Sequence, residues 1–411
     1  MSTTERTGLD PQRLAKIDDH LLRRYIQPKK IAGALTLVAR RGELAYLSPV
    51  GFMDLEREKP MREDTIFRIY SMTKPITSVA IMMLWEEGHW QLTDPVDRFI
   101  PKWRNLAVYQ AGMHPNYLTT PVERRMQMRD LLTHQSGLTY SIMNRTNVDA
   151  AYRQTGIGGT VIGAGDAPHP GTLADMVERL ADIPLEFSPG TKWNYSVSTD
   201  VLAHIVEVIS NQRFDQFLRE RIFDPLGMVD TGFSVPADKV DRFAANYGRG
   251  AEKRLVLVDD PMTSSYLQQP SFLSGGGGLV STARDYWRFC QMLLNGGELD
   301  GHRILGRKTI ELMTMNHLPD GKDLTELSVA AYSEIASEGV GFGLGFAVTL
   351  DPTLTGGGSK GEYYWGGAAS TIFWIDPTED LIVIFLTQLM PSGTFNFRGQ
   401  LKQLICSAFI D

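Results

Sequence analysis

The two ends of the chain carry mirrored patterns, and this mirror restricts the fold more than any other feature. At the amino end, an amphipathic stripe with a helical period precedes two apolar runs joined by a turn, and the carboxyl end reverses that order. The segments are the stripe after Asp10-Pro11 (Leu14, Ile17, Leu21, Leu22 and Tyr25), the runs 31–39 and 44–50, the runs 369–375 and 381–386, and the helical stripe 397–409. Such runs read as two β-hairpins, so we predict one antiparallel sheet built from both termini, with helices packed on it.

The middle of the chain has a mainly helical pattern. Helical segments such as 173–180, 200–210 and 214–222 are separated by turns rich in Pro and Gly. We therefore predict an α+β fold in which residues 1–75 and 311–411 form an α/β domain and residues 76–310 form an inserted, mainly helical domain.

Three glycine-rich stretches interrupt these patterns. The segment 139–170 has weak periodicity, and a loop of that length in an enzyme usually serves as a lid or a binding loop. The glycines at 275–278 and 356–358 predict turns where the backbone bends or approaches another group closely.

Charge and hydropathy exclude several classes of protein. The net charge is −7 and no Lys/Arg-rich run is present, which argues against nucleic acid as a partner. No apolar stretch has the length of a membrane span, and residues 1–7 lack the apolar core of a secretory signal. We expect a cytoplasmic protein, and nothing in the sequence indicates its oligomeric state.

Neither cysteines nor histidines predict a metal site. Cys290 and Cys406 lie far apart in apolar helical surroundings, so we expect both to be small buried hydrophobic residues rather than disulfide partners. No histidine has a metal-ligand spacing to another histidine or to a cysteine. We expect neither a metal nor another cofactor.

One short motif suggests nucleophilic catalysis. Ser71-Met72-Thr73-Lys74 precedes the apolar helical run from Ile76 to Trp85. Residues three apart share one helical face, so the amine of Lys74 is placed to take the hydroxyl proton of Ser71. An ordinary surface helix turn would also match this pattern. Pro75 further requires that the helix begin so that this proline falls within its first turn.

Two other patterns compete with this motif. Gly357-Gly358-Ser359-Lys360-Gly361 matches the G-x-S-x-G nucleophile elbow, but that elbow needs a buried strand before it and a helix after it. The flanking residues predict a hairpin turn instead. His134 lies in the ordered-looking stretch 131–138, and we expect it to hold a turn rather than to act as the base of a triad.

Two further segments have residues that could assist Ser71. Tyr195 lies in the loop 187–196, where its hydroxyl could relay a proton to a leaving group or simply pack the loop. Trp365-Gly366-Gly367 precedes a strand, and its glycines would let a substrate lie against the backbone with the N–H of Ala368 facing it. A plain strand-entry turn is the alternative.

Together these segments resemble the serine β-lactamase and penicillin-recognising superfamily, and within it the class C β-lactamase-like esterases, or family VIII carboxylesterases. The resemblance covers about residues 10–410. The segments that carry it, in order along the chain, are Ser71-Met72-Thr73-Lys74, 131–138, 187–196, 275–285 and Trp365-Gly366-Gly367.

The resemblance implies a role for each matched residue. Ser71 matches the acylated nucleophile of the family, Lys74 its partner base, and Tyr195 the tyrosine of its Y-x-N element. Trp365-Gly366-Gly367 takes the place of the K-T-G element that binds substrate. The N–H groups of Ser71 and Ala368 would then form the oxyanion hole. The resemblance also implies a β-lactamase/transpeptidase-like fold with the site in the cleft between its two domains.

Two departures from the family pattern narrow the substrate. Trp365 replaces the cation of K-T-G that would hold a β-lactam carboxylate, and Val197 replaces the amide of Y-x-N. Both changes favour a small, neutral, short-chain carboxylic ester. We therefore predict a carboxylesterase that works through an acyl-enzyme. An acyltransferase or a β-lactam or amide hydrolase on the same scaffold is the alternative, and a non-catalytic binding protein is a third.

Overall fold

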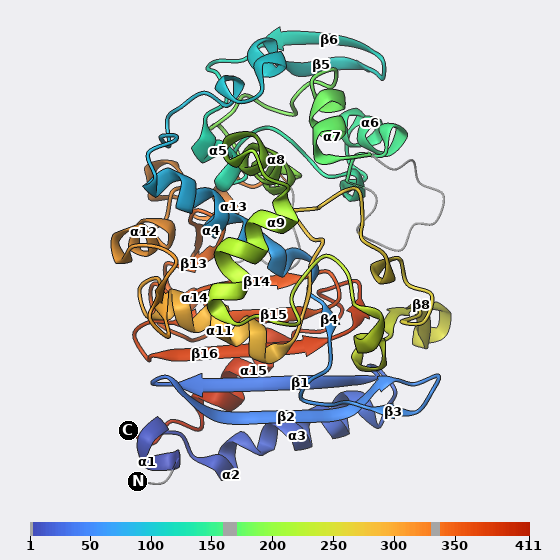
Figure 1. Ribbon diagram of the computed structural model, residues 1–411, viewed down its shortest axis with the longest axis vertical. Helices are drawn as coiled ribbons and strands as arrows, with labels where there is room; N and C mark the ends of the chain where they lie inside the picture. Colours follow the sequence, from blue (N-terminus) through green and yellow to red (C-terminus); the bar gives the residue numbers. More distant parts are fainter. Residues whose placement is uncertain (1–2, 159–170, 330–337) are drawn as a thin grey trace.

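An eight-stranded antiparallel sheet forms one end of the molecule (Figure 1). The computed structural model describes residues 3–158, 171–329 and 338–411. The strand order is β12-β13-β14-β15-β16-β1-β2-β3, so β1 lies between its hairpin partner β2 and the carboxyl-terminal β16. The strands are β1 (Gly33–Arg40), β2 (Glu43–Asp54), β3 (Lys59–Pro60), β12 (Val340–Phe342), β13 (Ala347–Thr349), β14 (Tyr363–Gly367), β15 (Thr371–Asp376) and β16 (Leu381–Thr387). The predicted α+β fold with a sheet from both termini is confirmed.

Both faces of the sheet are covered by helices. Every residue of β1 and β16 is buried, as the continuous apolar runs of these strands require. Phe373 of β15 lies opposite Ile384, so Phe373 and the neighbouring Phe385 point to opposite faces. Phe373 contacts Tyr286 of α11 (Ala283–Leu294), whereas Phe385 contacts Phe397 of α15 (Phe397–Cys406). Helix α11 therefore covers one face and α15 the other.

The amino-terminal helices share the face of α15. They contact β2 and α15, and both chain termini lie at the same end of the molecule (Figure 1). The single helix predicted after Asp10 is divided into α2 (Pro11–Leu14), α3 (Lys16–Leu21) and a π-turn (Leu22–Ile26).

Helix α4 (Thr73–Glu86) runs through the centre of the helical part. Its residues from Thr73 to Leu84 are all buried, and it packs against α8 (Ser198–Ser210). The remaining helices are α1 (Thr3–Thr7), α5 (Met128–Leu132), α6 (Asn147–Thr155), α7 (Leu173–Leu180), α9 (Phe214–Leu218), α10 (Asp224–Leu226), α12 (Arg307–Met313), α13 (Leu324–Leu327) and α14 (Pro352–Thr355). Within the described residues, no helix combines the length and apolar character needed to cross a membrane.

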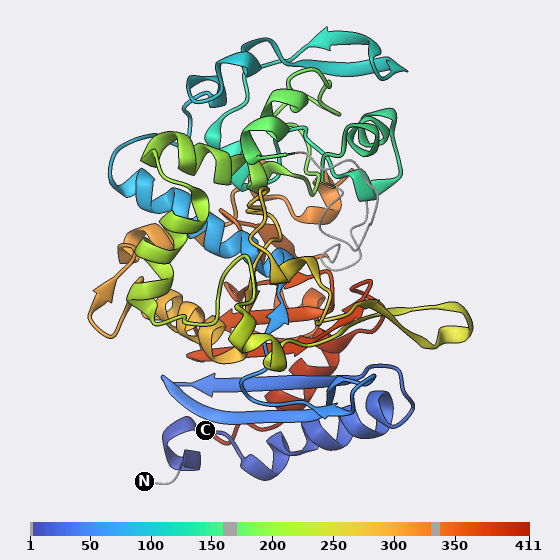
Figure 2. The same cartoon turned by 45° about the vertical axis from the view of Figure 1, so that its right-hand side comes forward.

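Short strands also occur between residues 76 and 310. They are β5 (Ala107–Met113), β6 (Asn116–Pro121), β7 (Asn246–Arg249), β8 (Leu255–Asp259), β9 (Val280–Ser281), β10 (Glu298–Leu299) and β11 (His302–Arg303); β4 (Phe67–Arg68) pairs with β9, and β17 (Leu389–Met390) with β7. Figure 2 shows the β5–β6 hairpin extending from the top of the molecule. Because α11 lies within 76–310 yet packs on the sheet, the division of the chain into two domains stays a prediction.

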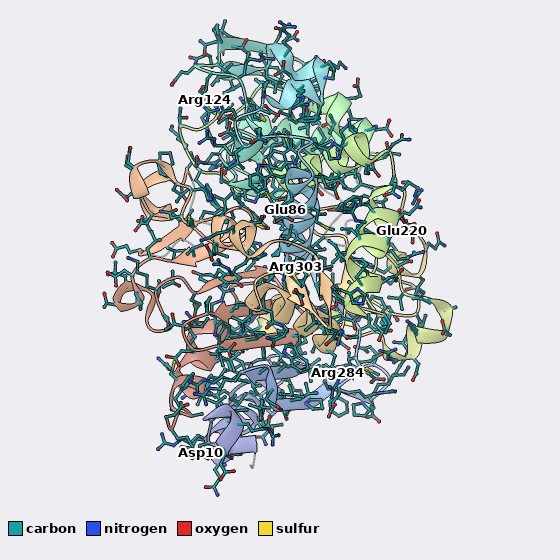
Figure 3. All side chains as sticks on the ribbon, turned by 60° about the vertical axis from the view of Figure 1, so that its left-hand side comes forward. Asp10, Glu86, Arg124, Glu220, Arg284 and Arg303 are labelled. Carbon is teal, nitrogen blue, oxygen red and sulfur yellow. The ribbon has the colours of Figure 1, made fainter. Side chains whose placement is uncertain are left out.

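Two buried cations form ion pairs with carboxylates. Lys402 contacts Glu362, and Arg68 contacts Asp259 at 2.6 Å. Asp10 at the sheet end and Arg124 at the helical end lie far apart along the long axis in Figure 3.

Two expectations from the sequence were wrong. Helix α6 lies in the segment predicted as a loop, because Thr146 and Asp149 form a capping box at its start and Gly156 ends it with a φ of 75°. The rest of that predicted loop, 159–170, lies outside the described residues. Cys290 is buried, but Cys406 is exposed, since it lies on the solvent side of the last turn of α15.

Candidate active site

Ser71 lies in a short 3-10 turn that leads directly into the central helix. The turn spans Tyr70–Met72 and α4 begins at Thr73, so Pro75 occupies the first turn of α4, where a helix needs no backbone donor. Tyr70 has a φ of 43°, a left-handed conformation that costs a non-glycine residue of order 1–3 kcal/mol. Its hydroxyl accepts a hydrogen bond from Asn246 Nδ2 at 3.0 Å, which helps to hold it there.

Three predicted site residues meet at the hydroxyl of Ser71. Ser71 Oγ accepts a hydrogen bond from Tyr195 OH at 2.7 Å and another from Lys74 Nζ at 3.2 Å. Lys74 and Tyr195 are each only 2% exposed, whereas Ser71 is half-buried. A reachable hydroxyl therefore faces two buried groups that can carry a proton.

The amine of Lys74 is held from a second direction. Lys74 Nζ donates to the carbonyl oxygen of Gly276 at 2.6 Å. It also lies 4.5 Å from the ring centre of Tyr195 and 5.3 Å from that of Tyr140, within the range of a cation–π contact. These contacts fix the amine beside Ser71.

Asp200 is a buried residue of this cluster to which the sequence analysis gave no chemical role. Its Oδ1 accepts hydrogen bonds from Ser274 Oγ at 2.6 Å and from the N–H of Gly276 at 2.9 Å. Gly276 thus connects the two groups: its N–H binds the carboxyl group of Asp200, and its carbonyl oxygen binds the amine of Lys74. Burial raises the pKa of Asp200, while the charge of Lys74 and both hydrogen bonds oppose that rise. The sequence signal that could have revealed Asp200 is a carboxylate in an apolar helix that starts just after Tyr195.

Gly276 has no room for a side chain. A Cβ at this position would lie 2.7 Å from Asp200 Oδ2 and 2.8 Å from Tyr140 OH. The close approach predicted for the glycines at 275–278 is confirmed here.

The end of β14 lies against the turn that carries Ser71. A Cβ on Gly367 would lie 2.4 Å from the carbonyl oxygen of Ile69, so only glycine lets the strand pass. Trp365 is 2% exposed, and its ring lies 5.4 Å from that of Tyr195. The ring of Trp365 therefore packs against the ring of Tyr195. Its role with Gly366 and Gly367 in substrate binding stays a prediction, as do the catalytic and oxyanion-hole assignments.

His134 stands beside the cluster as a packing residue. Its Nδ1 lies 3.1 Å from Ser196 Oγ, and its ring is 5.0 Å from the ring of Tyr195. Burial and the charge of Lys74 lower the pKa of His134 well below 6.5, so the ring stays neutral. It has a φ of 56°, as a residue that holds a turn does. Across the three described ranges, no group of three or more His, Cys, Asp or Glu residues forms a metal site.

Comparisons with known proteins identify the family of this chain. The β-lactamase family model matches residues 19–406. Protein Rv1367c of Mycobacterium tuberculosis is 37% identical over 365 residues, which are 88% of this chain and 86% of that protein. Esterase EstB of Burkholderia gladioli is 30% identical over 94% of this chain and 93% of its own length. The solved structure of EstCE1, a hydrolase with promiscuous acyltransferase activity, is 26% identical, covers 98% of this chain and 99% of its own, and superposes with a TM-score of 0.78. The chain belongs to the β-lactamase family.

Proposed function

We propose that this protein is a carboxylesterase that cleaves neutral, short-chain esters through an acyl-enzyme on Ser71. One observation carries the proposal: the half-buried hydroxyl of Ser71 lies 2.7 Å from Tyr195 OH and 3.2 Å from Lys74 Nζ. A serine becomes a nucleophile when a neighbouring group takes its proton, and two such groups are within reach here. The similarity to the esterase EstB and the hydrolase EstCE1 supports the same class of reaction.

In the first half of the proposed reaction, Ser71 Oγ attacks the ester carbonyl carbon and gives its proton to the Lys74–Tyr195 pair. The backbone N–H groups of Ser71 and Ala368 stabilise the resulting oxyanion, at about 3 kcal/mol for each donor. The carbon–oxygen bond to the alcohol then breaks, and the alcohol leaves with a proton from the same pair. The acyl group remains bound to Ser71.

In the second half, water replaces the alcohol. Water adds to the acyl carbon and gives a proton to the Lys74–Tyr195 pair. The bond to Ser71 Oγ breaks, Ser71 recovers its proton, and the carboxylic acid leaves. Asp200 accepts a hydrogen bond from the N–H of Gly276 and so helps to hold this residue, whose carbonyl oxygen binds Lys74, and we assign Asp200 a positioning role.

Two residues support a neutral substrate. Trp365 stands where a β-lactamase has a cation, and it is buried against Tyr195. Val197 supplies no amide to a substrate carbonyl. An anionic β-lactam would therefore lose a charge-assisted hydrogen bond that is worth more than a neutral one. A neutral ester has no carboxylate and therefore loses no such hydrogen bond.

Acyl transfer to an alcohol is the second candidate, because the similar structure of EstCE1 is that of a hydrolase with promiscuous acyltransferase activity. In that reaction an acceptor alcohol takes the place of water in the second half. The chemistry on Ser71 is otherwise the same.

A panel of chromogenic substrates tests the proposal. We expect turnover of p-nitrophenyl acetate and butyrate, slower turnover of the octanoate, and far slower cleavage of nitrocefin. Nitrocefin cleaved as fast as the best ester would contradict the neutral-ester assignment. Faster release of p-nitrophenol with added alcohol, together with a new ester product, would instead support the acyltransferase.

A further inference from the structure

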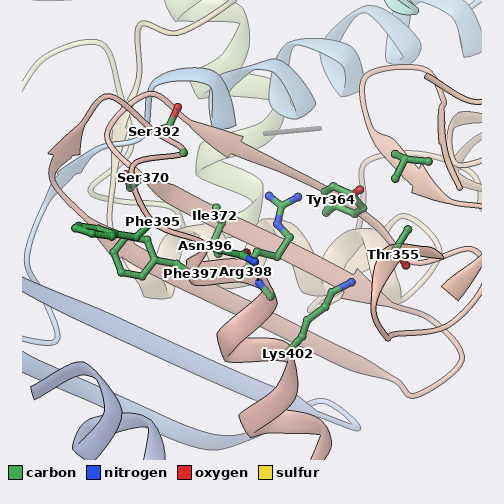
Figure 4. Close-up of a pocket in the computed structure, with 13 residues that line it drawn as sticks. Thr355, Tyr364, Ser370, Ile372, Ser392, Phe395, Asn396, Phe397, Arg398 and Lys402 are labelled. Atoms are coloured by element: carbon green, nitrogen blue, oxygen red, sulfur yellow. Dashed lines mark hydrogen bonds between the residues drawn. The ribbon is translucent and has the colours of Figure 1, made fainter. Parts of the chain in front are cut away.

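A cavity of about 320 Å³ lies on the face of the sheet opposite the catalytic cluster (Figure 4). Trp365 and Tyr364 are consecutive in β14, so their side chains point to opposite faces. Trp365 packs on Tyr195, whereas Tyr364 lines the cavity, as Ile372 of β15 does. The first turn of α15 closes the cavity from outside with Phe397. The cavity is therefore separate from Ser71.

Arg398 supplies the charge of this cavity. Its Nη2 donates to the carbonyl oxygen of Trp365 at 3.0 Å, and its guanidinium carbon lies 4.2 Å from the centre of the Tyr364 ring. Its Nε is buried and has no hydrogen-bond partner in the described part of the chain. Among those residues, no carboxylate forms an ion pair with Arg398. A ligand would therefore meet the outer nitrogens of this guanidinium rather than the enclosed Nε, and a charge-assisted hydrogen bond to them is stronger than a neutral one.

The other cation of the cavity is already neutralised. Lys402 Nζ binds Glu362, and both side chains are almost fully buried. The N-terminal end of α15, a helix of ten residues, adds partial positive charge beside Arg398. The net charge offered to a ligand therefore comes from Arg398 and the helix end.

The walls of the cavity combine apolar and polar groups. Tyr364, Ile372, Phe395 and Phe397 line it, with hydroxyl groups of Ser370 and Ser392 at its edge. Tyr364 and Phe397 are already buried by contacts within the protein, whereas part of Phe395 is still exposed. An anion with an apolar body would cover the exposed part of Phe395, which a bare inorganic anion would leave in water, at about 25 cal/mol per Å².

We propose that this cavity binds a small organic carboxylate, with its charged end on Arg398 and its apolar body against Tyr364, Phe395 and Phe397. A planar guanidinium matches the two oxygens of a carboxylate, and the contacts with Tyr364 and the Trp365 carbonyl already orient it. Such preorganisation lowers the entropy cost of binding. This site is independent of the esterase activity proposed above.

Isothermal titration of the full chain with octanoate tests the site. We expect saturable one-site binding that weakens about 10- to 100-fold in Arg398→Gln, with an intermediate loss in Arg398→Lys. The uncharged isostere 1-octanol is expected to bind as weakly to the wild type as octanoate does to Arg398→Gln. Arg254→Gln is the matched control, because Arg254 is 81% exposed and lies outside the cavity.

Three results would overturn the site. The first is equal octanoate affinity in the wild type and Arg398→Gln. The second is binding of 1-octanol or inorganic phosphate as tight as that of octanoate. The third is binding lost in Ser71→Ala but kept in Arg398→Gln, which would put octanoate in the catalytic cleft. Thermal unfolding of each variant shows whether it is folded, and if Arg398→Gln is not, Arg398→Lys and 1-octanol still decide.

Discussion

Ser71 and Ser359 both lie in sequence patterns that serine hydrolases use, yet their surroundings differ. The hydroxyl of Ser71 meets the buried Lys74 and Tyr195 at the start of a fully packed helix. Ser359 is partly exposed in the connection between α14 and β14, and in the described residues its hydroxyl has no hydrogen-bond partner. A serine is a nucleophile where a proton acceptor is held against it, and only Ser71 has one.

The glycines around Ser359 are explained by the backbone conformation of a turn. Gly357, Gly358 and Gly361 have φ values of 125°, 87° and 90°, which other residues rarely adopt. The G-x-S-x-G match therefore arises from a turn that leads into β14. The hairpin-type turn expected from the flanking residues is what the structure contains.

The largest expected effect separates the two serines directly. We expect Ser71→Ala to lower kcat/KM for p-nitrophenyl butyrate by about 10⁴-fold or more, because the covalent step is lost. Ser359→Ala, the matched control, should keep wild-type activity. Steady-state assays of both variants check this, and the reverse outcome would assign catalysis to the turn before β14.

A smaller effect is expected at the hydroxyl that faces Ser71. Tyr195→Phe keeps the ring packing on Trp365 and removes only the oxygen, so we expect kcat to fall about 10²- to 10³-fold with little change in KM. Tyr46→Phe is the control, since its hydroxyl bonds to Asp18 far from the cluster. Wild-type kcat in Tyr195→Phe would show that Lys74 alone moves the proton.

Asp200→Asn is expected to lower kcat/KM about tenfold, because the amide accepts the Ser274 and Gly276 hydrogen bonds less strongly. It also removes a negative charge near Lys74, so protonating that amine becomes less favourable and the acid limb of the pH profile moves to lower pH. Asp285→Asn is the matched control, because Asp285 is a buried, hydrogen-bonded carboxylate elsewhere. An unmoved acid limb in Asp200→Asn would reduce Asp200 to a purely structural residue.

The smallest effect concerns stability. The folded-state pKa of His134 lies below the unfolded value of 6.5, so below pH 6.5 the unfolded chain binds a proton that the folded chain does not. The contribution of the neutral His134 ring to the free energy of unfolding is fully present above pH 6.5. It falls by at most about 1.4 kcal/mol per pH unit as the pH drops. Urea unfolding at pH 7.5 and 5.5 should show a weaker pH dependence for His134→Gln than for the wild type. If the free energy of unfolding changed equally with pH in both proteins, His134 would have to take up a proton in the folded state.

The parts of this fold that follow from local pattern were predictable. The apolar runs 31–39 and 381–386 predicted β1 and β16. The family resemblance predicted that Ser71, Lys74 and Tyr195 belong to one site. The link from Asp200 through Gly276 to Lys74 joins residues 76 and 202 positions apart, which no periodicity shows. Burial of single helical residues such as Cys406 depends on which side of the helix the sheet covers.

One measurement tests the central claim most directly. A p-nitrophenyl alkylphosphonate reacts with an activated serine to give a stable adduct that water does not remove. Digestion and mass spectrometry of the treated wild type should find one phosphonyl group, on Ser71, and none on Ser71→Ala. An adduct on Ser359 or another residue, or ester turnover with no adduct on Ser71, would contradict the account.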